Sequence, residues 1–91
     1  MFEKIEDLKE YITERGYEDT IVFENPSYVT AVAGLTDDGR VVYDFDEMVN
    51  FLVETDGMEP EEAVEFIEYN TIRAIPYFGP NAPIVMYPIM D

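Results

Sequence analysis

The sequence predicts a single α+β domain, in which a three- or four-stranded, mainly antiparallel sheet carries an N-terminal helix and an αα-hairpin. Three observations predict this fold class. Apolar residues recur at helical spacing in three stretches, β-branched and aromatic runs lie between the first two stretches, and turn residues separate these runs. A chain of 91 residues has room for one domain, over residues 1–91, and its apolar fraction of 47% is too high for a disordered acidic tail.

The first predicted element is an amphipathic helix over residues 3–15. Leu8 and Ile12, four residues apart, share its apolar face, and Tyr11 lies at the edge of that face. Gly16 follows as a typical C-terminal stop, because glycine adopts the left-handed conformation that often ends a helix. We expect the apolar face of this helix to cover the sheet.

Three strands are predicted next. Residues 20–24 and 28–35 are rich in β-branched and aromatic side chains, and the turn sequence Asn25-Pro26-Ser27 separates them. A hairpin turn follows, with Gly39 available for positive φ, and residues 41–43 form the returning strand. These strands form the antiparallel part of the predicted sheet.

A helical hairpin is predicted after the last of these strands. Asp44 is a favourable N-cap for a helix over residues 45–55, and Glu47 completes a capping box with it. Pro60 suits the first turn of a second helix over residues 60–72. The short loop between the two helices makes them antiparallel neighbours.

Two polar residues near the end of the second predicted helix have different predicted roles. On a regular helix Asn70 falls on the apolar side, where a buried amide needs hydrogen-bond partners, so we interpret it as a structural amide that bonds neighbouring backbone. Arg73 is the only base after position 40, and we expect it to pair with a carboxylate or to cap the helix. A role in anchoring a ligand stays open.

The last part of the chain has a different composition. Residues 74–90 carry no charge and contain four prolines, which excludes a membrane-spanning helix. A short strand is predicted over residues 84–87, and it is expected at a sheet edge because the flanking prolines have no backbone N–H to donate to a ladder of hydrogen bonds. Aromatic residues and Met are enriched in interface cores, so this segment also offers a candidate homodimer interface. Its residues are Tyr77, Phe78, Met86 and Tyr87.

The composition excludes most catalytic chemistry. The chain has no Cys and no His, so disulfides, thiolate nucleophiles, imidazole bases and Cys- or His-ligated metals are excluded. Its 21 acidic and 5 basic residues give a formal charge of −16, which disfavours nucleic acid and anionic membrane as direct partners. No basic and apolar leader sequence is visible. We expect a cytoplasmic protein that is not an enzyme, with no catalytic residue, no cofactor and no metal.

Carboxylates near the predicted β-hairpin leave metal binding open as an alternative function. Oxygen ligands of the kind that Mg²⁺ and Ca²⁺ prefer are offered there by Asp37, Asp38, Asp44, Asp46 and Glu47. Their spacing does not match an EF-hand loop, and we interpret them as turn and N-cap residues. A carboxylate-based metal-binding protein is therefore the third functional hypothesis.

The negative charge is concentrated in the predicted helical hairpin. Residues 41–72 hold ten acidic residues and no basic residue. Glu61 and Glu65 are four apart and Glu65 and Glu68 three apart, so neighbours on the helix repel where a Glu–Lys pair would attract. Such carboxylates repeat every ~4.5–6 Å along a helix, comparable to the phosphate repeat of a nucleic-acid strand. The candidate partner-binding residues are Glu54, Glu61, Glu62, Glu65 and Glu68.

This pattern gives two main functional hypotheses. The first is a non-enzymatic interaction protein that mimics DNA and occupies the basic groove of a nucleic-acid-binding protein. The alternative is a small structural or regulatory domain that homodimerises through its uncharged C-terminal segment. Charge that serves only solubility or adaptation to high salt also stays open.

The C-terminal half of the chain is similar in sequence to a family of known proteins. The stretch over residues 38–78, with DGRVVYDFDEMVNFLVETDG and EEAVEFIEYNTIRAIPYF, resembles a family of small, acidic, largely uncharacterised bacterial and phage proteins. The resemblance implies no particular activity and no site residues. In its small size, acidity and compactness the chain is also similar to phage anti-defence DNA mimics, including inhibitors of CRISPR and restriction systems.

Overall fold

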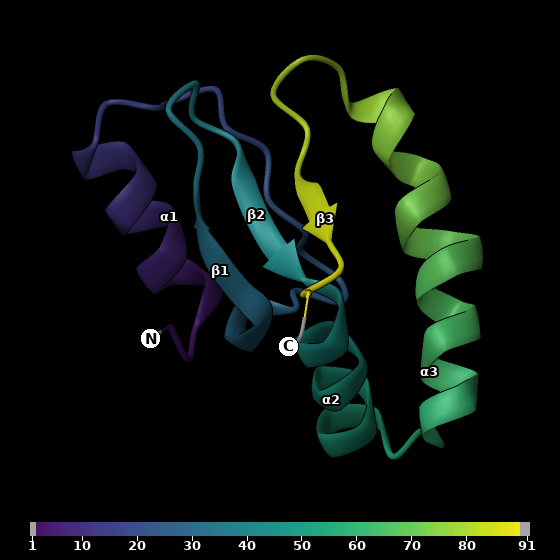
Figure 1. The fold of residues 1–91 in the computed structure, drawn as a ribbon. Helices are drawn as coiled ribbons and strands as arrows, with labels where there is room; N and C mark the ends of the chain where they lie inside the picture. The colour runs from purple at the N-terminus through teal and green to yellow at the C-terminus, as the bar shows by residue number, and fades with distance from the viewer. Residues whose placement is uncertain (1, 90–91) are drawn as a thin grey trace.

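The fold is an α+β arrangement of helices and a three-stranded sheet. The computed structural model describes residues 2–89 (Figure 1). In the view of Figure 1 the sheet lies in the middle, with the N-terminal helix to its left, the first helix of the helical hairpin below it and the second helix to its right. The predicted fold class is confirmed. Residue 90, the last of the predicted uncharged segment, lies outside the described residues.

Helix α1 (Ile5–Glu14) confirms the first predicted element. Leu8 and Ile12 are buried on the face that the helical spacing assigned to them. Gly16 follows with φ of 87°, a left-handed conformation that glycine adopts without steric cost. The predicted stop is therefore also confirmed.

The strand predictions are only partly correct. Residues 20–24 form no strand, and two of their backbone amides bond acceptors outside a strand ladder. The Phe23 amide donates to the Tyr43 hydroxyl at 3.2 Å and the Ile21 amide donates to the carbonyl of Asn81 at 3.3 Å. The predicted strand over 28–35 shortens to β1 (Val32–Leu35), because a 3-10 turn over Val29–Ala31 precedes it.

The sheet is mixed rather than mainly antiparallel. Strand β2 (Val41–Asp44) pairs antiparallel with β1 through the predicted hairpin and parallel with β3 (Ile84–Met86), in the order β1-β2-β3. The helical hairpin is the reason for the parallel pair, since a long helical connection returns the chain to the same end of the sheet. Strand β3 lies at a sheet edge, as predicted.

Both helices of the predicted hairpin are present. Helix α2 (Phe45–Asp56) begins at Asp44, whose carboxylate accepts from the Glu47 amide at 3.2 Å. The predicted capping box is only half correct, because the Glu47 carboxylate accepts from the Asn50 side-chain amide at 2.7 Å. Helix α3 (Pro60–Phe66) follows, with proline in its first turn as predicted.

The helix continues beyond α3 in a different geometry. Residues Ile67–Ile72 form a π-helical segment, η2, and Ile75–Phe78 form a 3-10 segment, η3. The wider π turn places Ile67 and Thr71, four apart, on the buried side and leaves Asn70 exposed. The prediction of a buried Asn70 is therefore wrong, although its amide does bond backbone, donating to the carbonyl of Phe66 at 3.2 Å.

Arg73 takes the second of its two predicted roles, because it is the C-cap residue of η2 and its backbone amide donates to the carbonyl of Thr71. Its guanidinium lies over the ring of Tyr69, 5.9 Å from the centroid, in a cation–π contact. The ion pair found within residues 2–89 joins Lys9 to Glu24, so Arg73 forms none with a carboxylate of this part of the chain.

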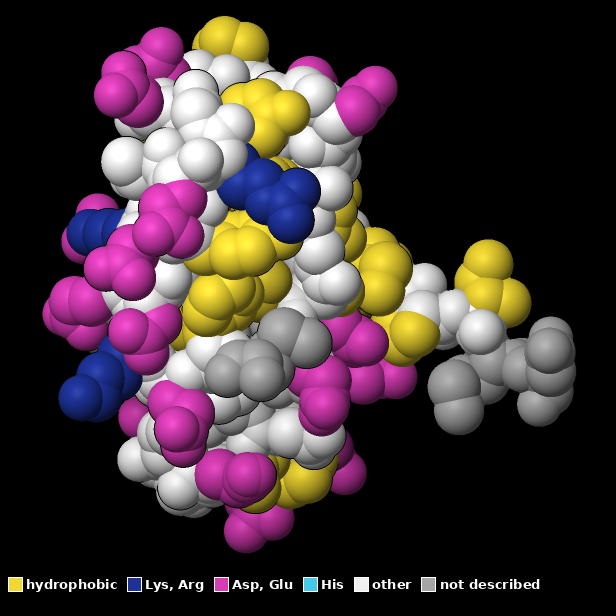
Figure 2. Space-filling view, turned by 90° about the vertical axis from the view of Figure 1, so that its left-hand side faces the viewer, with side chains coloured by type: hydrophobic (Ala, Val, Ile, Leu, Met, Phe, Trp, Pro, Cys, Tyr) yellow, Lys and Arg dark blue, Asp and Glu magenta, His cyan; other side chains and the backbone are white. Residues whose placement is uncertain are grey.

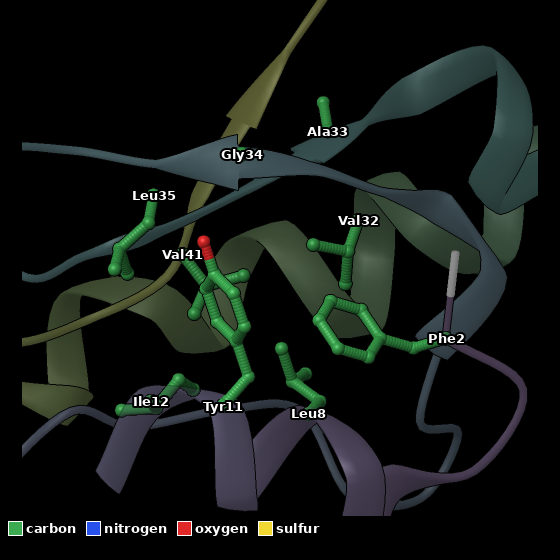
Figure 3. A pocket seen from close by; sticks show the side chains of 9 residues that line it. All are labelled: Phe2, Leu8, Tyr11, Ile12, Val32, Ala33, Gly34, Leu35 and Val41. Atoms are coloured by element: carbon green, nitrogen blue, oxygen red, sulfur yellow. The ribbon is translucent and has the colours of Figure 1, made fainter. Parts of the chain in front are cut away.

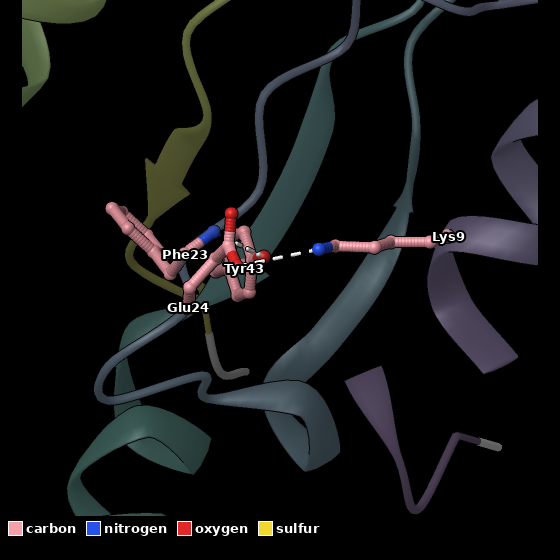
Figure 4. A network of polar contacts seen from close by, with 4 residues as sticks. All are labelled: Lys9, Phe23, Glu24 and Tyr43. Atoms are coloured by element: carbon pink, nitrogen blue, oxygen red, sulfur yellow. Dashed lines mark hydrogen bonds and ion pairs between the residues drawn. The ribbon is translucent and has the colours of Figure 1, made fainter. Parts of the chain in front are cut away.

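Aromatic side chains form the centre of the core. Tyr28 and Tyr43 are fully buried, and the ring of Phe23 packs on both, with centroids 5.5 and 4.7 Å away. Figure 4 shows Phe23 and Glu24 pointing in opposite directions, so that the Glu24 carboxylate meets Lys9 at 3.3 Å. Burial raises the pKa of Tyr43 to about 12, because the ionised phenol is poorly solvated there.

Candidate interaction surfaces

The helical hairpin positions the five predicted partner-binding carboxylates. Glu54 lies in the last turn of α2, and the loop places it at the same end of the hairpin as Glu61 and Glu62 at the start of α3 (Figure 1). Glu65 lies further along α3 and Glu68 lies in η2. All five side chains are exposed.

Both helices of the helical hairpin are capped where they begin, and α2 is also capped where it ends. Asp44 caps the start of α2, and Gly57, with φ of 69°, ends the helix in the left-handed conformation. At the start of α3 the Glu59 amide donates to the Glu62 carboxylate at 3.4 Å. Glu62 therefore serves the helix start as well as adding to the surface charge.

Basic residues do not neutralise this surface. Arg40 donates through Nε to the carbonyl of Ala82 at 2.8 Å, and the Arg15 guanidinium lies over the ring of Tyr11. The ion pair between Lys9 and Glu24 belongs to α1 and to residues 20–24, which follow it. Within the described residues, no base pairs with a carboxylate of the hairpin.

The acidic residues near the β1–β2 turn have local hydrogen-bond roles. The Thr36 hydroxyl bonds both the Asp38 carboxylate and the Arg40 amide, which ties the turn together. Asp44 is used as the helix cap. Among residues 2–89, no group of three or more Asp, Glu, His or Cys side chains lies close enough to hold a metal ion.

The structure divides the predicted oligomer interface into two parts. Tyr77 and Phe78 lie in η3, before β3, whereas Met86 ends β3 and Tyr87 follows it, so the pairs lie at opposite ends of the strand. Tyr77 is 89% exposed, while Phe78 packs its ring against Phe23. Tyr87 is 59% exposed although its ring contacts Phe45.

An apolar groove that was not predicted from the sequence lies between α1 and the sheet. Figure 3 shows side chains from α1, such as Leu8 and Tyr11, facing Val32, Leu35 and Val41 of the two strands across a space of about 250 Å³. The lining contains no charged side chain, so it offers no acid–base or metal chemistry. The expectation that this helix covers the sheet is therefore only partly correct, and Tyr11, at the edge of the helix face, is one of the lining residues.

The face that carries α1 is mixed in character. Figure 2 shows hydrophobic side chains gathered near the centre of this face and acidic side chains over its left-hand part.

None of the helices within residues 2–89 has the length and the apolar composition that a membrane span requires.

Comparisons with known proteins gave no relative. No protein-family model, no curated protein and no solved structure matches the chain.

Proposed function

We propose that this chain is a non-enzymatic interaction protein that acts in the cytoplasm, and that its acidic helical hairpin occupies the basic nucleic-acid-binding groove of another protein. An inhibitor of the anti-CRISPR or anti-restriction type is the concrete form of this proposal. The observation that carries it is the exposure of the carboxylates on α2, α3 and η2, with ten acidic residues and no base over residues 41–72.

Physical chemistry favours a partner for this surface over a purely solvated face. Glu61 and Glu65 repel each other, and a small domain retains such pairs at a cost of ~0.2–0.5 kcal/mol each. A concentration of exposed negative charge on the helical hairpin speeds the encounter with a basic groove and makes it sensitive to salt. Displacement of DNA from that groove is the expected consequence.

Charge reversal on two helices tests the proposal. The variant E61K/E65K/E68K changes the hairpin, and the matched control E3K/E6K/E10K changes exposed residues at the start of the chain and on α1. Each triple substitution takes the net charge from −16 to −10, because each Glu→Lys exchange adds two charges. Partners are captured from a bacterial lysate at low salt, eluted with duplex DNA or high salt, and then titrated as purified proteins.

The expected result is loss of binding by the hairpin variant and retention by the control. Duplex DNA should compete with the wild-type chain, and the affinity should fall steeply as salt rises. Equal binding by both variants, or a complex that DNA does not displace, contradicts DNA mimicry.

A homodimer through the uncharged segment is the second candidate. The exposure of Tyr77 and Tyr87 on a segment without charge favours it, because this segment avoids the repulsion between two chains of charge −16. Sedimentation of wild type and Y77S at high micromolar concentration tests it. A wild-type chain that remains monomeric contradicts this candidate.

A further inference from the structure

A hollow, separate from the apolar groove described above, lies between residues 21–28 and the helix that runs from α3 into η3. Its volume is about 380 Å³, within the range of small-molecule sites, which begins near ~300 Å³. Aromatic rings and neutral polar groups line it together. The residues that matter most are Phe23, Asn25, Phe66, Asn70, Thr71 and Phe78.

Two backbone irregularities meet at this hollow. Tyr28 has φ of 50°, which is rare for a bulky residue, and η2 is π-helical over six residues. The hydroxyls of Tyr28 and Thr71 share a hydrogen bond of 2.6 Å, which joins the two irregular segments. Strained backbone and π-helical turns concentrate at binding sites, where the surrounding structure holds them in place.

The π-helical turn determines which polar group faces the hollow. It rotates Asn70 out of the core and into the lining, where one amide hydrogen bonds the Phe66 carbonyl. The second amide hydrogen and the side-chain oxygen remain for a ligand. Asn25, also exposed, adds a second carboxamide to the lining.

The charges around the hollow define the class of ligand. Glu24 is the one charged residue in the lining, and its carboxylate turns away toward Lys9 (Figure 4). No base lines the hollow, and the net charge of −16 repels anions. Aromatic walls and neutral carboxamides therefore match a neutral ring with adjacent hydrogen-bond donor and acceptor groups.

We propose that this hollow is a binding site for a small, neutral, one- or two-ring aromatic compound whose edge carries such a donor–acceptor pair, as in aromatic carboxamides and nucleobases. The ring packs against Phe66 and Phe78, and the edge pairs with the Asn70 amide. This ligand site is independent of the acidic hairpin surface and of its protein partner.

Titrations of amide chemical shifts with nicotinamide and with adenine test the site. We expect saturable shifts confined to residues 21–28 and 66–78, with a weaker response to nicotinate, which has the same ring but an anionic carboxylate. Absence of saturable shifts with both neutral compounds overturns the proposal. Equal or tighter binding of nicotinate overturns the assignment to neutral ligands.

Matched variants connect the binding to Asn70. N70A should weaken the binding about three- to tenfold, the value of one neutral hydrogen bond, whereas N50A changes an exposed Asn on α2 outside the hollow and should bind as wild type. A74L fills the hollow and should abolish binding. The amide spectra of all three show whether they fold, and binding by folded N70A and A74L at wild-type affinity overturns the proposal.

Discussion

At the residue scale, the hydrogen bond between Tyr28 and Thr71 links two distant parts of the chain. Both residues are buried, and burial raises the pKa of the Tyr28 phenol while the bond from Thr71 opposes that effect. The loss of folding stability is larger when one buried hydroxyl is left without its partner than when both hydroxyls are removed together. The two residues therefore contribute unequally to stability.

Removal of the Thr71 hydroxyl should destabilise the fold more than removal of the Tyr28 hydroxyl. T71V leaves the buried tyrosine hydroxyl without a partner and should lower the free energy of unfolding by ~1–3 kcal/mol. Y28F should lower it less, because the Thr71 hydroxyl can turn to a carbonyl of the preceding helical turn. Guanidinium unfolding of both variants and of the double variant measures these differences.

The control for this prediction is Thr55, which is exposed on α2. T55V makes the same chemical change at a helical site and should alter stability by no more than ~0.5 kcal/mol. A T71V protein as stable as Y28F would contradict the unequal contributions of the two hydroxyls, and T71V and Y28F proteins both as stable as the wild type would show that the bond contributes nothing to stability.

At the element scale, the β1–β2 hairpin depends on one glycine. Gly39 has φ of 84°, and a Cβ placed there would clash with the ring of Tyr17. That ring is itself fixed, because the Tyr17 hydroxyl donates to the carbonyl of Asp37 at 3.0 Å. Gly34 on β1 differs in both respects, since its φ is not positive and a Cβ would meet open space.

The two glycines should therefore respond in opposite directions to alanine. G39A should destabilise the protein by at least ~1–2 kcal/mol through the left-handed conformation alone, and the clash should add to this. G34A should be neutral or stabilise by up to ~1 kcal/mol, because glycine in a strand carries excess unfolded-state entropy. Thermal unfolding of both variants tests this pair, and a G39A protein as stable as G34A would contradict the assigned turn.

The sequence predicted elements well where local rules decide them. Positive φ at Gly39 and the Asp44 cap follow from single residues and their neighbours, and both are confirmed. Residues 20–24 have strand composition, but their amides bond a tyrosine hydroxyl and a distant loop, which no local pattern contains. The π-helical segment η2, which contacts Tyr28 through Thr71, leaves Asn70 exposed, and the spacing of a regular helix did not indicate this.

The candidate sites were predictable to different extents for the same reason. The carboxylates of the hairpin could be assigned from helical spacing, and all five are exposed. The two hollows could not be predicted, because each is formed by segments that are distant in sequence. The proposed interface at Tyr77 and Tyr87 divides because the strand between them carries the chain across the sheet.

At the scale of the whole molecule, charge and stability oppose each other. The chain carries −16, and the ion pair found among residues 2–89 lies between exposed side chains of Lys9 and Glu24, where such pairs contribute little. Self-repulsion of this size lowers the stability of a compact fold. Salt screens this repulsion, so conditions that weaken the proposed partner complex should strengthen the fold.

A single charge reversal on α3 should separate these two effects. E65K replaces two repulsive contacts, with Glu61 and Glu68, by two attractive ones and should raise the free energy of unfolding by about 1 kcal/mol at low salt. E18K makes the same change of net charge at an exposed turn residue that is not itself part of a helix, so its smaller effect measures the general charge term. Urea unfolding of both variants at low and high salt gives the comparison, and the advantage of E65K should shrink as salt rises. If E65K stabilises the fold no more than E18K, the carboxylates on α3 do not repel one another appreciably. If E65K stabilises the fold and also weakens partner binding, the retained repulsion is the energetic cost of that binding surface.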